Sequence, residues 1–224
     1  MFVESEHPRD KDGKFTDKET TTYSDNGDRL LKAVKEYNPN DLKSQVDRVK
    51  FKEDLPEKTT SAIKNIERKT KGLDYEVGTI IDKDGNVLQS VDGSHNEVYL
   101  EKSLLKNAIL THNHPNGSCF SYDDIKGFLD GEVYQLRATT DKGKTYVLTR
   151  TKDFVVPSLA YNYKKATGLG GEGQNRIQEL FEYYLDSGYS ASRAKFQATS
   201  DYNEEWLLKN GNKYNVKFEV KWDE

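Results

Sequence analysis

The chain has 224 residues, of which 32% are charged and 34% hydrophobic, which suits one domain with appendages that never join a packed core. Its net charge of -4, its sequence pI of about 5.7 and the lack of a long Lys/Arg block exclude a general attraction for phosphate backbones, so nucleic acid is not an expected partner. One cysteine, Cys119, rules out an internal disulfide, and no apolar run approaches the roughly 20 residues that cross a bilayer, so we expect a cytoplasmic protein with no membrane partner.

The N-terminal part of the chain is poor in periodic apolar residues. Residues 1–27 are rich in charges, threonine and glycine, and we predict a flexible tail. A short amphipathic helix is expected after Asp28, because several apolar residues share one helical face: Leu30, Leu31, Val34 and Tyr37. A second helix is predicted with Thr59 or Thr60 as its N-cap and with Gly72 at its end.

The middle of the chain alternates between β-rich runs and turns. Residues 75–81 and a strand from Val87 flank a turn and form a predicted hairpin. A second hairpin is expected around Asp141-Lys142-Gly143. The remaining predicted elements are a short helix over residues 103–108, a strand over 108–111, a helix over 121–129 ended by Gly131, and the strands of the second hairpin over 132–139 and 145–149.

The character of the chain changes again after Pro157. Residues 168–173 are rich in glycine, which is typical of a flexible connection, and an amphipathic helix is predicted to follow and to end at Gly188. Both tryptophans and many tyrosines lie in this last third. We therefore predict that residues 158–224 form a helical, aromatic-rich extension that packs on or beside the core.

The most informative stretch lies between residues 111 and 124. On a strand, residues two apart point to the same side, so His112 and His114 can place both imidazoles towards one ion. Pro115 ends that strand, and Ser121 is a good N-cap for the next helix, which puts Asp124 in its first turn. Two imidazoles and one carboxylate leave a fourth tetrahedral position open, as in a catalytic zinc site.

A hydrolytic zinc site also needs a general base, and other polar residues close to the motif could take part in the site. Glu76 is the preferred base because it begins the β-rich run, and Glu67 in the preceding helix is its competitor. Asp123 is expected to be a solvated acid of the first helical turn. Cys119 is expected to be a packed loop residue, with metal ligation or oxidation as the alternative. His95 is expected in a turn, with a place near the substrate as the alternative.

These residues together resemble the JAB/MPN family, also called JAMM metalloproteases, and within it the RadC-like branch. The family's motif is an upstream Glu, then His-x-His-Pro, a short loop and Ser-x-x-Asp, which correspond here to Glu76, His112 to Pro115, and Ser121 to Asp124. The loop before Ser121 is at the short end of the family's range, and the match covers about residues 70–150.

The resemblance implies an α/β (α+β) fold, with a mixed, curved β-sheet flanked by helices. The domain would cover residues 28–157, including the N-terminal helices. The resemblance also implies that His112, His114 and Asp124 bind Zn²⁺, that Glu76 is the acid/base, and that Ser121 stabilises the oxyanion.

The function expected from the motif and the resemblance is a zinc peptidase or isopeptidase that acts on a protein or peptide. The family resemblance implies a ubiquitin-like protein as one candidate substrate. A phage structural protein is the other, because the segment that begins at His7 resembles pieces of bacteriophage and mobile-element structural proteins. A phage-encoded enzyme would act in the cytoplasm of its bacterial host. The alternatives are a non-catalytic module of the same fold that binds a partner through residues 158–224, and a nucleic-acid enzyme, which is an old association of the RadC-like name.

Overall fold

The computed structural model describes residues 55–152, 155–168 and 170–222. The predicted N-terminal tail and the helix expected after Asp28 lie outside these residues. Within the described ranges, no helix combines the length and the apolar character needed to cross a bilayer.

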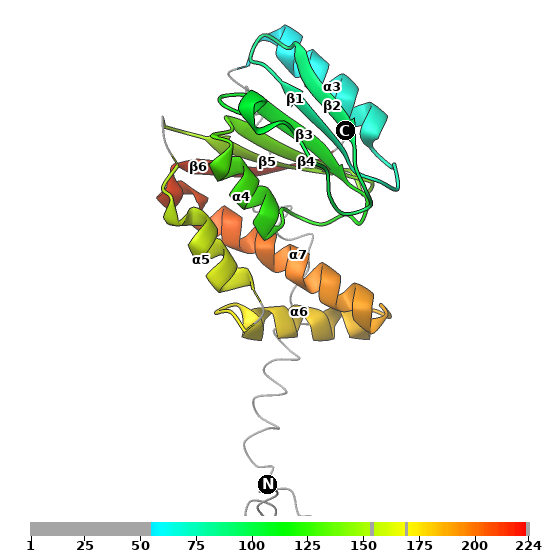
Figure 1. Ribbon diagram of the computed structural model, residues 1–224. Helices are drawn as coiled ribbons and strands as arrows, with labels where there is room; N and C mark the ends of the chain where they lie inside the picture. The colour runs from blue at the N-terminus through cyan, green and yellow to red at the C-terminus, as the bar shows by residue number, and fades with distance from the viewer. Residues whose placement is uncertain (1–54, 153–154, 169, 223–224) are drawn as a thin grey trace, which may run out of the picture. The chain divides into compact units, whose positions relative to one another are not determined.

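A six-stranded mixed sheet forms the centre of the fold, in the order β2-β1-β3-β4-β5-β6 (Figure 1). Only β3 and β4 run parallel, and all other neighbours are antiparallel. The two predicted hairpins are therefore present, and the prediction of a mixed sheet flanked by helices is confirmed. The strands are β1 (Val77–Ile81), β2 (Val87–Asp92), β3 (Ile109–His114), β4 (Gln135–Thr140), β5 (Lys144–Arg150) and β6 (Val216–Trp222).

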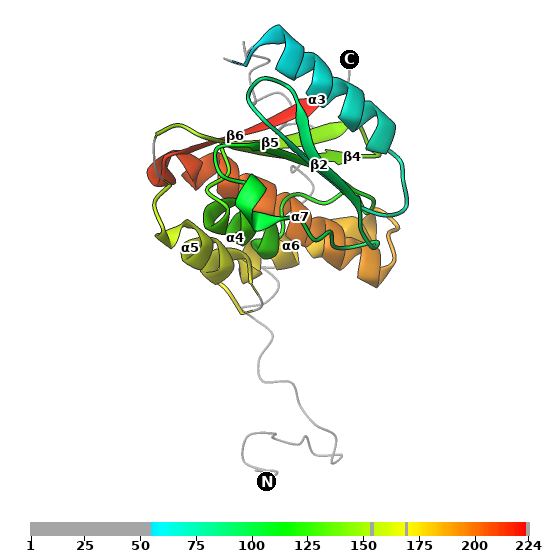
Figure 2. The same ribbon diagram turned by 45° about the horizontal axis from the view of Figure 1, so that its top comes forward.

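Helices cover both faces of the sheet (Figures 1 and 2). On one face, Ile63 of α3 packs with Ile81 and Ile109 in a small apolar cluster. The other face carries the larger core beneath α4, α5 and α7, and α6 packs against α7. The helices are α3 (Glu57–Thr70), α4 (Tyr122–Asp130), α5 (Ser158–Thr167), α6 (Gln174–Asp186) and α7 (Ala191–Asn210), with 3-10 turns at η2 (Lys102–Leu104) and η3 (Gly211–Tyr214).

Two helix predictions in the first half of the described chain need correction. The helix predicted from Thr59 begins at Glu57, with Pro56 as N-cap, so Thr59 lies inside α3. The Thr59 hydroxyl instead donates to the carbonyl of Lys83 at 2.6 Å and ties the helix to the turn between β1 and β2. The helix expected over residues 103–108 is only the 3-10 turn η2.

The C-terminal third contains a strand that the sequence analysis missed. The predicted amphipathic helix is present as α6, between two further helices, α5 and α7, but β6 follows them and pairs with β5 from Lys144–Trp222 to Arg150–Val216. Its alternate residues Val216, Phe218 and Val220 enter the larger core. The expectation of a helical extension over residues 158–224 therefore needs correction, since β6 in this part of the chain completes the central sheet.

Candidate metal centre

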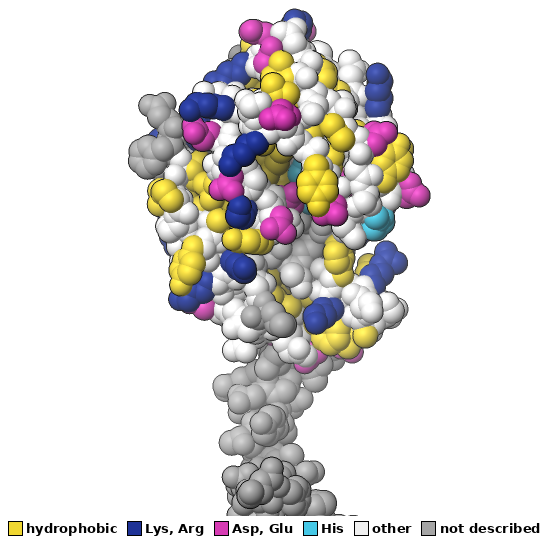
Figure 3. Space-filling model, in the orientation of Figure 1, with side chains coloured by type: hydrophobic (Ala, Val, Ile, Leu, Met, Phe, Trp, Pro, Cys, Tyr) yellow, Lys and Arg dark blue, Asp and Glu magenta, His cyan; other side chains and the backbone are white. Residues whose placement is uncertain are grey.

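The two histidines lie at the end of β3, where strand alternation sends both imidazoles to the face that carries α4. His112 pairs with Gly78 of β1 and with Ala138 of β4, and His114 pairs with Thr140 of β4. The space over Gly78 is filled by Val98 and Leu100, because a Cβ at this position would lie 2.9 Å from a Val98 methyl and 3.1 Å from a Leu100 methyl. Only 4% of His112 and 5% of His114 is exposed, and Figure 3 shows a little histidine surface inside a hollow bordered by hydrophobic and acidic side chains.

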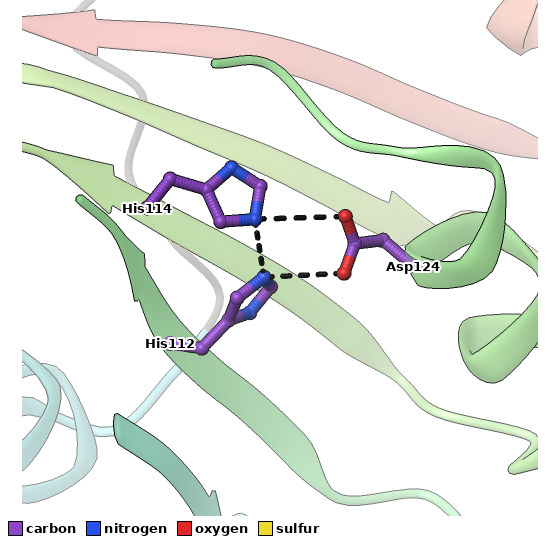
Figure 4. Close-up of side chains that lie close together, drawn as sticks. All are labelled: His112, His114 and Asp124. Carbon is purple, nitrogen blue, oxygen red and sulfur yellow. Dashed lines mark hydrogen bonds and ion pairs between the residues drawn. The ribbon is translucent and has the colours of Figure 1, made fainter. Parts of the chain in front are cut away.

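Asp124 reaches the histidines from the first turn of α4, as predicted. Ser121 is the N-cap: its hydroxyl oxygen accepts from the Asp124 N–H at 3.1 Å, and Asp124 Oδ2 accepts from the Ser121 N–H at 2.7 Å. This reciprocal capping box directs the carboxylate towards β3. Nε2 of His112 lies 3.3 Å from Oδ1, Nε2 of His114 lies 3.5 Å from Oδ2, and the two Nε2 atoms are 2.8 Å apart (Figure 4).

The hydrogen bonds around the rings fit a bound cation. The Ser118 carbonyl can only accept, so Nδ1 of His114, 2.8 Å away, is the donor, and in the neutral ring this leaves a lone pair on Nε2. Two ring nitrogens 2.8 Å apart would repel if both presented lone pairs, so a proton or a cation belongs between them. Nδ1 of His112 is buried and has no partner within the described ranges. The three ligand atoms lie within 4.8 Å of one another, and these residues could hold a metal ion.

The Asp124 carboxylate and the His114 imidazole shift each other's pKa values. Burial raises the pKa of Asp124, but His112 and His114 lower it by more, so this pKa lies well below its ordinary value. Burial lowers the pKa of His114, whereas Asp124, the Ser118 carbonyl and Glu76 together raise it above its ordinary value. Asp124 is therefore an ionised carboxylate, which is the form that binds a metal.

Glu76 lies beside this group, immediately before β1, the strand that neighbours the histidine strand β3, as expected. It is 7% exposed, and burial raises its pKa, although the charges of His112 and His114 oppose this shift. Asp124 raises the pKa of Glu76 further. Glu76 is not one of the three converging ligands, but its carboxyl interacts electrostatically with all three of them.

Glu67, the competitor for the role of base, is engaged elsewhere. Its carboxylate pairs with Arg137, with Nε to Oε1 at 2.6 Å and Nη2 to Oε2 at 3.2 Å, and it accepts from the Thr111 hydroxyl at 3.2 Å. Thr111 precedes His112 on β3, so its side chain points to the opposite face of the sheet. Glu67 therefore joins α3 to the sheet and lies away from the histidines.

Comparison with known proteins adds no further evidence: no family model, no curated protein and no solved structure matches the chain. The geometry brings together all three ligands that the sequence predicts, with the predicted base beside them.

The structure also places the remaining candidates from the sequence, Asp123, Cys119 and His95. Asp123 is exposed, as expected for a first-turn acid. Cys119 is 1% exposed, burial raises its pKa well above the ordinary value, and it is outside the metal group, which supports the packed-loop interpretation. His95 is exposed, and its Nδ1 lies 2.7 Å from the Asp74 carbonyl oxygen. Its charge is also among those that lower the pKa of Glu76, so it lies on the Glu76 side of the site.

The loop between the histidines and Asp124 is held by residues that the sequence analysis did not find. The Cys119 N–H donates to the Ser200 hydroxyl of α7 at 2.9 Å. The Phe120 carbonyl accepts from the hydroxyl of Tyr163 at 2.6 Å and from the Asn203 amide at 3.3 Å. No local signal identifies such partners, because they are 43 to 83 residues away in the sequence.

Proposed function

We propose that the protein is a zinc-dependent hydrolase that cleaves a peptide or isopeptide bond. The observation that carries this proposal is the convergence of His112, His114 and Asp124 beside the buried Glu76. Structural zinc sites use four protein ligands, whereas catalytic sites use three and keep one position open. Within the described ranges, no fourth His, Cys, Asp or Glu joins the group.

The chemistry divides between the ion and the chain. Zinc bound to these ligands would supply a Lewis acid for the substrate carbonyl and would lower the pKa of water to about 7. Glu76, as a carboxylate, accepts a proton from the attacking water and then delivers it to the leaving amine. A carboxyl whose pKa is raised by burial suits this double task, because it holds the transferred proton better than an exposed one does.

Ser121 has two roles in the proposal. Its hydroxyl donates to Asp124 Oδ2 at 2.7 Å, and this bond orients the ligand. The second role is stabilisation of the oxyanion that forms when water adds to the substrate carbonyl, for which the hydroxyl must leave Asp124 and donate to the new oxygen.

The substrate class follows from the JAB/MPN resemblance. The order of Glu76, the histidine pair, Ser121 and Asp124 along the chain supports a JAMM-type enzyme, and so does a mixed sheet with helices on both faces. The proposed substrate is therefore a protein or peptide, with a ubiquitin-like protein or a phage structural protein as candidates.

The first test is the zinc content of the purified protein, measured by elemental analysis. We expect about one zinc per chain in the wild type, loss of zinc in His114→Ala and Asp124→Asn, and full zinc in Asp123→Asn, the matched control one residue away. Zinc that persists in both ligand variants would refute the site.

The second test is turnover on a panel of fluorogenic peptides and isopeptide-linked conjugates. Glu76→Gln should keep its zinc and lose about 10²- to 10⁴-fold in turnover, because the amide cannot accept the proton. Undiminished cleavage by this variant would remove Glu76 from the mechanism.

A further inference from the structure

The residue between the two histidines, Asn113, has no place in the chemistry above, yet it is buried and both ends of its side-chain amide are hydrogen-bonded. Asn113 is 2% exposed. Its Oδ1 accepts from the Val77 N–H at 2.7 Å, and its Nδ2 donates to the Tyr75 carbonyl at 2.8 Å. A peptide N–H can only donate and a carbonyl can only accept, so these partners settle the orientation of the amide. Both peptide groups flank Glu76.

The side chain of Asn113 continues the hydrogen bonding between β1 and β3 beyond the last pair of main-chain partners. The pairing of β1 with β3 ends at Gly78 opposite His112. In the same antiparallel register, the next positions would be Val77 opposite Asn113 and Glu76 opposite His114. The amide bonds replace main-chain bonds at this point, so the chain around Glu76 stays attached to the histidine strand beyond the end of the ladder.

The other edge of the same segment is held by the main chain. The Glu76 N–H donates to the Ser94 carbonyl at 2.7 Å, and the Gly93 N–H donates to the Glu76 carbonyl at 2.7 Å. Hydrogen bonds to 93 and 94 thus hold the backbone of Glu76 from the β2 side, and among the described residues the Asn113 side chain holds the two adjoining peptide groups from the β3 side. Removing Asn113 frees one edge only, and that edge faces the ligands.

We propose that Asn113 is a positioning residue that sets the Glu76 carboxyl against the histidine pair, an inference that rests on the proposed function of Glu76. Asn113 lies between His112 and His114 in the chain, and its side chain forms hydrogen bonds to the peptide groups on both sides of Glu76. The ligands and the base are therefore tied together through a single residue. Misplacing a reacting group by about 1 Å can cost roughly 100-fold in rate, so this tie has a direct consequence for turnover.

The test uses Asn113→Leu, which is similar in size and makes neither bond, and Asn113→Ser as a smaller second variant if the leucine does not fold. Thr111→Val is the matched control, because it removes another buried side-chain bond from β3, to Glu67, without touching the Glu76 segment. For each protein we would measure zinc content, amide hydrogen exchange along β1, and turnover on the cleavable peptide identified with the wild type.

In the Asn113 variants we expect one zinc per chain, at least about tenfold faster exchange at the Val77 amide than in the wild type, and unchanged exchange at Thr79 to Ile81. We expect kcat to fall about 100-fold while KM stays the same. Thr111→Val should match the wild type in all of these readouts.

The outcomes separate this inference from the proposed function. Unchanged exchange at Val77, or faster exchange with full turnover, would overturn the positioning role. Loss of zinc would also overturn it, since Asn113 would then support the ligands and not the base. A zinc-loaded wild type that cleaves no peptide would sink the proposed function, and the exchange at Val77 would still decide whether Asn113 fixes the Glu76 segment.

Discussion

Replacement of Glu67 by alanine should destabilise the protein without touching the metal centre. The Glu67 carboxylate pairs with Arg137 at 2.6 and 3.2 Å, and the two side chains are only 11% and 4% exposed. The truncation leaves a guanidinium buried with only part of its bonding, and loss of one partner from a buried ion pair costs about 3–5 kcal/mol. Since each kcal/mol shifts Tm by about 2–4 °C in a domain of this size, we expect a fall of roughly 6–20 °C.

Urea and thermal unfolding followed by circular dichroism measure this loss, with zinc content and turnover determined at 25 °C in parallel. The double variant Glu67→Met/Arg137→Met should regain most of the stability, because apolar replacements leave no unpaired buried charge. The reasoning fails if Glu67→Ala loses less than about 1 kcal/mol, or if it keeps its stability and loses turnover. The second result would place Glu67 and not Glu76 in the chemistry.

Three further predictions concern single residues. Ser121→Ala should lower the stability by about 1 kcal/mol and weaken zinc binding about 10- to 100-fold in calorimetric titrations, because Asp124 loses its cap and its orienting donor; unchanged affinity would contradict this. Ser200→Ala should cost about 1–3 kcal/mol in urea unfolding, because the buried Cys119 N–H loses its acceptor, and a loss within experimental error would mean that another acceptor replaces it. Burial lowers the pKa of Lys221 from 10.5 to about 8, so the unfolded chain holds more protons between these values and stability rises with pH across them. Lys221→Met should remove this part of the rise, and coinciding pH profiles of Tm for the two proteins would refute the assignment.

The candidate metal ligands can be predicted from the sequence because their placement follows local rules. Strand alternation aligns His112 with His114, and the capping preference of Ser121 puts Asp124 in the first turn of a helix. Each rule acts over a few residues and needs no knowledge of the rest of the chain. β6 also has a local signal, the alternation of Val216, Phe218 and Val220, which the sequence analysis passed over in favour of a helical extension.

The supporting contacts could not be predicted, because they depend on how distant segments meet. The sequence around Glu67 and Glu76 does not indicate which carboxylate lies near the histidines. Glu67 is kept away from them because α3 packs on the opposite face of the sheet. The bonds of Asn113 depend on where the pairing of β1 with β3 stops. The partners of Cys119 depend on the path of α7 across the sheet.

The bonds from α7 to the ligand loop also set an order of events during synthesis. Ser200 follows Cys119 by 81 residues, and Asn203 follows Phe120 by 83. At about 5–20 residues per second, the ribosome adds this length in roughly 4–16 s. During that interval the nascent loop lacks the helix that holds it, although His114 and Asp124 have both been made. The three candidate ligands are therefore synthesised before α7, and the loop between His114 and Asp124 gains its bonds to Ser200 and Asn203 only once that helix has been made.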